Sequence, residues 1–322
     1  MKIRAFKRFL SQINKLTKKQ VKKLQNQLNQ ENSLKVINSV SVKVEHCPHC
    51  GSLNFYKWGV RSKLQRYKCK ECNKTFNVLS KTPLARLRYK EKWDVYAKEL
   101  ISSSSIVKSA KVCDVAVSTS FRWRHRMLKA SKSVKAKKLQ GIVEFDESYF
   151  PRSEKGNHHL TRKPHKRGSW ASRGLSLQEQ VTVLIVRDRN GNTSDAILSN
   201  SQSDSISEVM LPLLDSNDVL LCSDSKSSYI RFAKVHNFVH KTINASREHV
   251  NGIYHVQNVN AYTSRLKNWM VHFHGVSTKY LDNYLSWMCM LDTERELTSD
   301  ALLKIVINYR NEDFCFLPLM RI

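Results

Sequence analysis

The sequence predicts a multidomain chain in which a small cysteine-rich module and a helical bundle precede an α/β or α+β body. Two CxxC pairs, separated by 18 residues, lie between residues 47 and 72. Three short helical patterns follow over residues 92–130, and strand patterns mixed with helical ones begin at residue 141. A chain of 322 residues is long enough for two or three such modules, each with its own core.

The positive charge is concentrated in the first part of the chain. Residues 1–140 hold 34 Lys and Arg against 7 Asp and Glu, whereas the remainder holds 21 against 20. A solvated surface would distribute its charges more evenly, so this asymmetry indicates a polyanion-binding front end on a near-neutral body. Nucleic acid is the expected partner.

The first 40 residues read as a basic helical arm. Leu16, Val21, Leu24 and Leu28 form a weak apolar stripe, so a docked helix and a solvated arm both remain open. A basic amphipathic membrane helix is a further alternative. No apolar run approaches the roughly 20 residues of a membrane span, and the first residues lack the apolar stretch of a signal peptide. We therefore expect a cytoplasmic protein.

Residues 41–80 predict a zinc ribbon. Each CxxC can direct two thiolates toward one ion, and four thiolates complete the closed tetrahedral shell of structural Zn²⁺. The expected ligands are Cys47, Cys50, Cys69 and Cys72. Aromatic and basic residues alternate between the pairs, which fits a nucleic-acid surface, although zinc ribbons also make protein contacts. We interpret the other four cysteines as buried thiols: Cys113, Cys222, Cys289 and Cys315.

Residues 81–135 have the sequence pattern of a helix-turn-helix domain. An apolar helix in "SIVKSAKVCDV" is followed by a short turn and by the Arg-rich helix "AVSTSFRWRHRML". In that geometry the second helix would lie in the DNA major groove and present Ser118, Thr119, Arg122 and Arg124. A small helical bundle that does not bind DNA would share the pattern.

Two aspartates follow strand patterns in the body. Asp146 lies within the strand "GIVEFDESYF", and Asp224 ends the strand "DVLLCSD". Carboxylates on neighbouring buried strands are costly unless a cation meets them, and Mg²⁺ prefers such hard oxygen ligands. The alternative for Asp224 is a role as the cap of the helix that follows it.

The segment "HVQNVNAYTSRLKNW", residues 255–269, predicts an amphipathic helix with a polar border. Asn260 and Lys267 lie side by side next to its apolar arc, about 10 Å apart along the axis. An amide oxygen can bind a hard metal ion and a lysine can hold a phosphate, although an ordinary helix with a polar border would look the same. The arc contains Val259, Tyr262, Leu266, Trp269, Met270 and Phe273.

Together these features resemble insertion-sequence transposases of the DDE superfamily, prokaryotic mobile-element proteins with a zinc ribbon, a helix-turn-helix and a ribonuclease-H-like catalytic domain. The resemblance covers nearly the whole chain. It rests on CPHC with CKEC, "VEFDESYF", "KRGSWASRGLSLQEQVTVLIVRDRNG", "LCSDSKSSY" and the block "GIYHVQNVNAYTSRLKNWMVHFHGVSTKYLDNYLSWMCML".

The resemblance implies an α/β ribonuclease-H-like catalytic domain over residues 136–322. Asp146 and Asp224 take the positions of the first two catalytic aspartates, Asn260 that of the usual third glutamate, and Lys267 that of a lysine seven residues later, a DDNK set. It further implies two Mg²⁺ or Mn²⁺ ions bound to Asp146, Asp224 and Asn260, terminal inverted repeats and target DNA as partners, and at least a dimer. A protein of this kind would be associated with the bacterial nucleoid. Glu144, on the strand face of Asp146, and Glu248 are candidate auxiliary ligands.

Three functions are consistent with this sequence. The first is a transposase that cleaves DNA and transfers strands. The second is a catalytically silent DNA-binding regulator or transposase remnant, which should have lost Asp146 or Asp224. The third is a ribonuclease-H-like nuclease acting on RNA or repair intermediates, which does not explain the basic front end.

Overall fold

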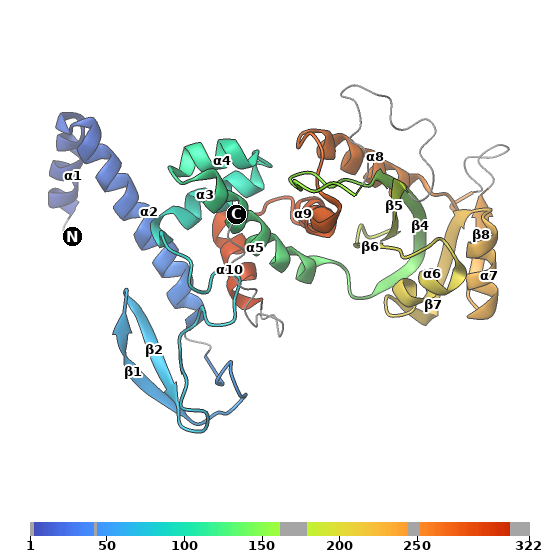
Figure 1. Cartoon of the computed structure of the whole chain (residues 1–322), viewed down its shortest axis with the longest axis horizontal. Helices are drawn as coiled ribbons and strands as arrows, with labels where there is room; N and C mark the ends of the chain where they lie inside the picture. The colour runs from blue at the N-terminus through green and yellow to red at the C-terminus, as the bar shows by residue number, and fades with distance from the viewer. Residues whose placement is uncertain (1–2, 42–43, 162–178, 244–251, 310–322) are drawn as a thin grey trace. The chain divides into compact units, whose positions relative to one another are not determined.

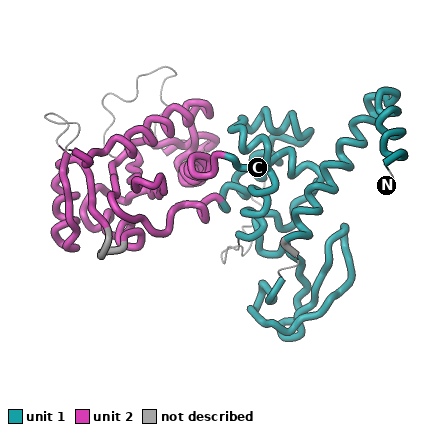
Figure 2. The backbone as a smooth tube through the Cα atoms, turned by 180° about the vertical axis from the view of Figure 1, so that it is seen from behind, with its two compact units in different colours: residues 1–130, 296–322 teal, residues 131–295 magenta. Residues whose placement is uncertain are grey.

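A computed structural model describes residues 3–41, 44–161, 179–243 and 252–309. The chain divides into two compact units, shown in Figure 2. Residues 1–130 and 296–322 form the first unit, and residues 131–295 form the second. Each unit has its own core and is considered separately below.

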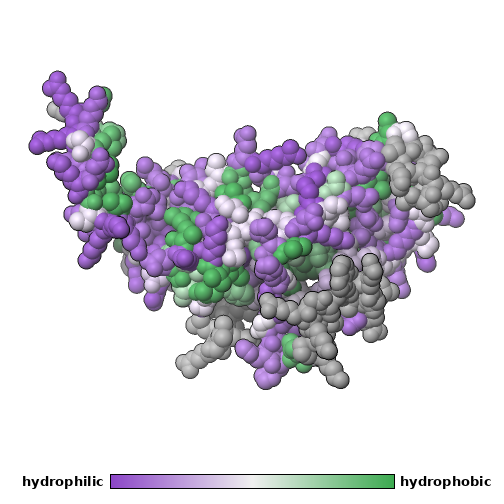
Figure 3. Space-filling view, turned by 90° about the horizontal axis from the view of Figure 1, so that it is seen from above, coloured by the Kyte–Doolittle hydropathy of each residue, from purple (hydrophilic) through white to green (hydrophobic). Residues whose placement is uncertain are grey.

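The N-terminal arm is helical and only its second half is docked. The arm consists of α1 (Ile3–Gln12), η1 (Ile13–Lys15) and α2 (Lys18–Ser41). Leu34 and Ile37 of α2 are buried, whereas Val21 and Leu28 of the predicted stripe are exposed. Figure 3 shows a hydrophobic patch at this end of the chain, where α1 exposes Ile3, Phe6, Phe9 and Leu10.

The predicted ribbon is a three-stranded antiparallel sheet. It contains β1 (Phe55–Arg61), β2 (Leu64–Cys69) and β3 (Thr75–Phe76), in the order β1-β2-β3. Its core is a small cluster of Phe76 with Cys47 and Cys69, against which Phe55 and Tyr67 pack. So small a core needs additional stabilisation, which a bound metal can provide.

Three short helices follow in helix-turn-helix order. They are α3 (Trp93–Ile101), α4 (Ile106–Cys113) and α5 (Val117–Ser131), preceded by η2 (Lys90–Lys92). Ser105 caps α4, and Asp114 ends it in the left-handed conformation (φ 51°), which turns the chain into α5. The Tyr96 hydroxyl of α3 donates to the Ser120 carbonyl of α5 at 2.5 Å, tying the first helix to the last.

The second unit is built on a five-stranded mixed sheet with the order β6-β5-β4-β7-β8 (Figure 1). The two hairpin pairings, β4 with β5 and β5 with β6, are antiparallel, and β7 and β8 add in parallel to β4. This is the predicted ribonuclease-H-like arrangement. The strands are β4 (Leu139–Pro151), β5 (Gln180–Asp188), β6 (Thr193–Ile197), β7 (Leu214–Asp224) and β8 (Val239–Ile243).

Helices cover both faces of this sheet. On one face α6 (Ser203–Met210) and α7 (Ser227–Val235) pack on a core that includes Val143 and Phe145 of β4. On the other face α8 (Gln257–Val271) and α9 (Leu281–Thr293) pack on Val183 and Ile185 of β5. The short helices η3 (Lys132–Val134) and η5 (Thr278–Tyr280) precede β4 and α9. Because strand side chains alternate, the even-numbered residues of β4 face α8.

The predicted C-terminal boundary of the catalytic domain, residue 322, requires correction. The last helix, α10 (Ser299–Asn308), contacts α2 and α3 of the first unit. Ser299 donates a 2.7 Å hydrogen bond to Asp94 of α3, and Leu302, Leu303, Val306 and Ile307 are buried. The apolar face of α10 therefore completes the helical bundle, and the sheet-containing unit ends at residue 295.

None of the helices in the described parts of the chain combines the length and the apolar composition that a membrane span requires.

Candidate catalytic and metal sites

The two predicted catalytic aspartates lie on adjacent strands. Asp146 is on β4 opposite Ile185 of β5, and β4 pairs in parallel with β7 through Glu144 and Cys222. Asp146 follows Glu144 by two residues on β4, and Asp224 follows Cys222 by two residues on β7. The register therefore places the two aspartates beside each other on the same face of the sheet. The structure thus brings together two residues that are 78 positions apart in the sequence.

Asp224 does not cap the following helix. Its Oδ1 accepts a hydrogen bond from the Lys226 backbone N–H at 3.2 Å, and Lys226 is itself the N-cap position of α7. The side chain is otherwise exposed at the end of β7. The alternative capping role for Asp224 is therefore wrong, and its carboxylate is accessible to a ligand.

Asp146 is in an environment that disfavours its charge. The pKa of Asp146 is raised to about 6, mainly by burial and also by the neighbouring carboxylates of Asp224 and Glu147, while the Glu147 backbone N–H opposes the rise. Lys267 also lowers this pKa, so its ammonium group acts on Asp146 from α8. Buried carboxylates with raised pKa values are common at functional sites because a substrate or metal replaces the missing counter-charge.

Helix α8 carries the other two predicted residues. Val259, Tyr262 and Leu266 are buried against the sheet, as the apolar arc predicts, while Asn260 and Lys267 are exposed beside it. The Asn260 backbone N–H makes the first helical bond, to Val256 at 3.1 Å. Within the described residues the Asn260 side chain makes no hydrogen bond, so its amide oxygen is available as a ligand.

A network of three charged residues holds α8 beside α9. Asp292 of α9 accepts from Arg187 of β5 at 2.7 Å and from Arg265 of α8 at 2.8 Å. Arg187 also lies over the Tyr262 ring, 5.4 Å from its centroid. The arginines hold the pKa of Asp292 below its usual value despite partial burial. Lys267 follows Arg265 by two residues, so these contacts also hold in place the turn of α8 that carries Lys267.

Glu144 is not an auxiliary metal ligand, contrary to the sequence-based prediction. It is fully buried, and its Oε2 accepts from the backbone N–H groups of Asn258 and Val259 at 2.8 and 3.0 Å. Its Oε1 accepts from the Asn258 side chain at 3.0 Å and pairs with Arg189 at 3.2 Å. Both oxygens are committed to protein donors. Glu248, the other candidate, lies outside the described residues.

The two aspartates and the Asn260 amide are a chemically suitable set for Mg²⁺ or Mn²⁺. All three offer hard oxygen atoms, which these ions prefer over nitrogen or sulfur. The proximity of Asp146 and Asp224, together with the raised pKa of Asp146, marks a place where a cation would be stabilised. The donor set therefore fits the predicted metal site.

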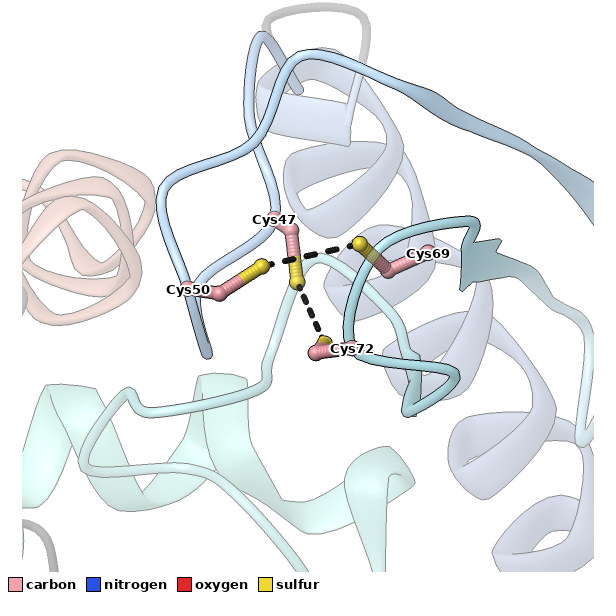
Figure 4. A group of neighbouring side chains, drawn as sticks. All are labelled: Cys47, Cys50, Cys69 and Cys72. Carbon is pink, nitrogen blue, oxygen red and sulfur yellow. Dashed lines mark hydrogen bonds between the residues drawn. The ribbon is translucent and has the colours of Figure 1, made fainter.

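The four cysteines of the CxxC pairs form a second candidate metal centre (Figure 4). Their sulfur atoms lie within 4.8 Å of one another, with 3.7 Å between Cys47 and Cys72 and 3.6 Å between Cys50 and Cys69. These separations match the edge of a tetrahedron with Zn–S bonds of about 2.3 Å, which is about 3.8 Å. The Cys72 backbone N–H helps to lower the pKa of Cys69 to about 7, which favours the thiolate.

The predicted DNA-contacting residues of α5 separate into two groups. Ser118 and Arg122 are exposed and Thr119 is half-buried, so these side chains can reach a ligand. Arg124 is fully buried, and its Nη2 donates to the Ser104 carbonyl at 2.5 Å and to Ser109 Oγ at 3.2 Å. The prediction of Arg124 as a DNA contact is therefore wrong, because the arginine joins α5 to the start of α4 inside the bundle.

Sequence reasoning did not identify the partners of Glu147. This residue follows Asp146 on the opposite face of β4, where its Oε2 accepts from Lys226, Tyr149 and Ser201. The proximity of Lys226 to Asp224 in the sequence was a possible signal, since a basic residue close to one aspartate can neutralise a carboxylate beside the other.

Comparisons with known proteins find similarity to proteins of transposable elements. The family model described as the ISXO2-like transposase domain matches residues 138–289. An uncharacterized protein in transposable element ISH50 of Halobacterium salinarum is 25% identical over 244 residues, covering 74% of this chain and 82% of that protein.

Two solved assemblies share a remote likeness. One is the simian T-cell lymphotropic virus intasome in complex with PP2A regulatory subunit B56 gamma, with a TM-score of 0.31 and 11% identity over 61% of this chain and 67% of that chain. The other is the Mos1 Strand Transfer Complex, with a TM-score of 0.30 and 12% identity over 66% of this chain and 73% of that chain. The family match, which contains both aspartates, Asn260 and Lys267, identifies residues 138–289 as similar to the DDE transposase domain of ISXO2-like elements.

Proposed function

We propose that this protein is a DNA transposase that binds the terminal inverted repeats of its insertion sequence and catalyses metal-dependent strand cleavage and strand transfer. The observation that carries the proposal is the position of Asp146 and Asp224, level on parallel strands, with Lys267 of α8 acting on Asp146. The match of residues 138–289 to the ISXO2-like transposase domain supports the same chemistry.

The catalytic residues in this proposal have separate roles. Asp146, Asp224 and Asn260 would hold two Mg²⁺ or Mn²⁺ ions, which supply Lewis-acid stabilisation of the attacking and leaving oxygens. Lys267 holds the scissile phosphate next to the aspartates by its positive charge. Because Asn260 is neutral, the set carries one negative charge fewer than three carboxylates, so the substrate phosphate contributes more to the local charge balance.

The first unit would bind and position the DNA. Ser118, Thr119 and Arg122 on α5 are placed to contact DNA, and the surplus of Lys and Arg before residue 140 favours a polyanion. The zinc ribbon adds exposed Tyr56 and Trp58, on which bases could stack. Two element ends have to be joined, so the active form would be a homodimer or a larger oligomer in the synaptic complex.

The proposal is tested by Mg²⁺-dependent cleavage and strand transfer on DNA that carries the flanking repeats of the element. Asp146→Asn and Asp224→Asn are expected to abolish both reactions while repeat binding persists. Asp188→Asn is a matched control, because this buried aspartate is on β5 and both of its oxygens accept from Asn192. Undiminished strand transfer by Asp224→Asn would refute the mechanism.

The same assay separates the rival functions. A catalytically silent regulator would bind the repeats but would not cleave them, whichever divalent metal ion is added. A ribonuclease-H-like nuclease would cleave RNA or branched DNA without joining strands. Strand transfer to a second duplex is specific to the transposase.

A further inference from the structure

We propose that Glu144 is a positioning residue that fixes the start of α8 to the strand carrying Asp146 and thereby sets where Asn260 and Lys267 lie. This inference rests on the proposed function for the roles of those two residues. Glu144 itself touches neither DNA nor metal in this proposal, because protein donors occupy both of its oxygens.

The sequence of α8 explains why a remote cap is needed. An N-cap side chain normally accepts a hydrogen bond from the second or third helical N–H, but the N-cap here is Val256, which has no side-chain acceptor. Those two N–H groups belong to Asn258 and Val259, and both donate to Glu144. A residue 114 positions away from Asn258 therefore performs the capping, and its negative charge suits the helix N-terminus.

The strand that carries Glu144 is paired on both of its sides. Glu144 is in the middle of β4, paired with Arg187 of β5 on one side and with Cys222 of β7 on the other. Arg189, just beyond the end of β5, forms an ion pair with the Glu144 carboxylate at 3.2 Å. It also donates a hydrogen bond to the Ile253 carbonyl at 2.9 Å. The segment leading into α8 and the first turn of α8 are thus both attached to the central strands of the sheet.

Through these Glu144 hydrogen bonds, only a few residues separate Asp146 on β4 from Asn260 on α8. Asp146 follows Glu144 by two residues on the same strand face, and Asn260 follows Val259 by one residue in the helix. The position of Asn260 relative to Asp146 is consequently set by hydrogen bonds of 2.8–3.0 Å and a few covalent links. Catalysis is sensitive to this geometry, since a displacement of about 1 Å can reduce a rate about 100-fold.

The test compares Glu144→Gln with Asp195→Asn in the full-length protein. Asp195 is an equally buried carboxylate of the same sheet, paired with Lys135 at 2.7 Å. Its charge acts on the Tyr262 hydroxyl of α8, but among the described residues it makes no hydrogen bond or ion pair with the first turn of that helix. We expect Glu144→Gln to lower kcat for strand transfer about 100-fold with little change in KM for DNA, and to speed hydrogen exchange at Asn258 and Val259. Asp195→Asn should do neither.

A second variant distinguishes positioning from capping. In the Glu144→Gln background, Val256→Asp supplies a local N-cap, which should restore slow exchange at Asn258 and Val259 without restoring kcat. A helix that is capped but no longer attached to β4 would behave in this way. Recovery of kcat by Val256→Asp, unchanged exchange in Glu144→Gln, or a kcat equal to that of Asp195→Asn would each overturn the proposal.

Mn²⁺ binding without DNA separates this inference from the proposed function. If Glu144 positions Asn260, then Glu144→Gln and Asn260→Ala should both weaken Mn²⁺ binding, by about tenfold or more, as outer-shell changes do elsewhere. If the wild-type protein transfers no strands but both variants bind Mn²⁺ more weakly, the transposase activity is refuted and the positioning role is supported. Unaltered Mn²⁺ affinity in Glu144→Gln would refute the positioning role even in an active transposase.

Discussion

Lys226 donates a hydrogen bond of 2.6 Å to the Glu147 carboxylate, and this contact connects the segments that carry the two candidate catalytic aspartates. Glu147 directly follows Asp146 on β4, and Lys226 is two residues beyond Asp224 at the end of β7. The Glu147 side chain is 3% exposed and that of Lys226 is 31% exposed. The pair therefore acts as a partly buried link behind the site.

Removal of Lys226 should destabilise the second unit. In Lys226→Met the Glu147 carboxylate loses its cationic partner while remaining buried, which we expect to cost about 2 kcal/mol of unfolding free energy. Urea denaturation followed by pulsed hydrogen exchange of the β4 peptide measures this change. The exposed pair of Lys63 with Glu31, at 2.9 Å, provides the control, because solvent screens this pair and Lys63→Met should leave the unfolding free energy nearly unchanged. Equal losses in the two variants would contradict the prediction.

The raised pKa of Asp146 predicts a pH dependence of stability in the metal-free protein. The pKa is about 6 in the folded protein against an ordinary value of 3.8, mainly because burial disfavours the carboxylate. The folded state therefore binds more protons than the unfolded state between these values, and stability falls as pH rises from about 4 to about 6. The loss should approach about 3 kcal/mol, at about 1.4 kcal/mol per pKa unit.

The Asp146 contribution is isolated as the difference in unfolding free energy between wild type and Asp146→Asn across this pH range. The window should shift down in Asp224→Asn and up in Lys267→Met, because Asp224 raises the Asp146 pKa and Lys267 lowers it. A difference that stays constant from pH 4 to pH 7 would contradict the assignment.

Substitutions of Asn260 and Lys267 should have distinct patterns. If the Asn260 oxygen is a metal ligand, Asn260→Asp should retain more strand transfer than Asn260→Ala, since a carboxylate oxygen can replace the amide oxygen. Lys267→Met removes a charge directed at the phosphate and should lower kcat about 100-fold. Single-turnover rates with Mn²⁺ compare these variants, with the exposed neighbour Asn268→Ala as control. Equal activity of Asn260→Asp and Asn260→Ala would argue against ligation.

Most of the fold could be predicted from sequence patterns because its elements follow simple local rules. The strand pattern "GIVEFDESYF" corresponds to β4, and the apolar arc corresponds to α8 except for Phe273, which follows the end of the helix at Val271. The hairpin between β5 and β6 contains Asn190-Gly191, a common turn pair, and Gly191 has φ +89° there. These features depend on neighbours within a few residues, and a periodic pattern contains that information.

Tertiary partners could not be predicted in the same way. Strand parity showed that Glu144 shares a face with Asp146, but it did not show that Asn258 and Val259 would occupy its oxygens. Likewise, Arg124 is in an Arg-rich stretch, and only the packing of α5 on α4 buries it. The boundary at residue 295 depends on contacts of α10 with α2, which precedes it by more than 250 residues. Such long-range contacts leave no periodic signal.

The cysteine cluster should contain one structural zinc ion that the ribbon needs to fold. Cys72→Ser should lose the metal together with the β1-β2-β3 sheet, since structural zinc can supply about 10–16 kcal/mol of folding free energy. Metal analysis with hydrogen exchange of the β1 and β2 peptides tests both effects. Cys113→Ala is the control, because this thiol is buried in the same unit outside the cluster and should leave the zinc in place. Zinc retained by Cys72→Ser would contradict four-cysteine ligation.

The two arginines of α5 should produce opposite phenotypes when replaced. Arg122 is exposed, so Arg122→Ala should weaken DNA binding and reduce the slope of log affinity against log salt by about 1, without altering stability. Arg124 is buried and donates to Ser104 and Ser109, so Arg124→Met should lower the thermal stability of the bundle, with DNA affinity lost only through unfolding. Salt-dependent fluorescence anisotropy and thermal denaturation of both variants measure these effects. A folded Arg124→Met protein with a reduced salt slope would show that Arg124 reaches the DNA after all, whereas an unchanged slope in Arg122→Ala would remove α5 from the DNA interface.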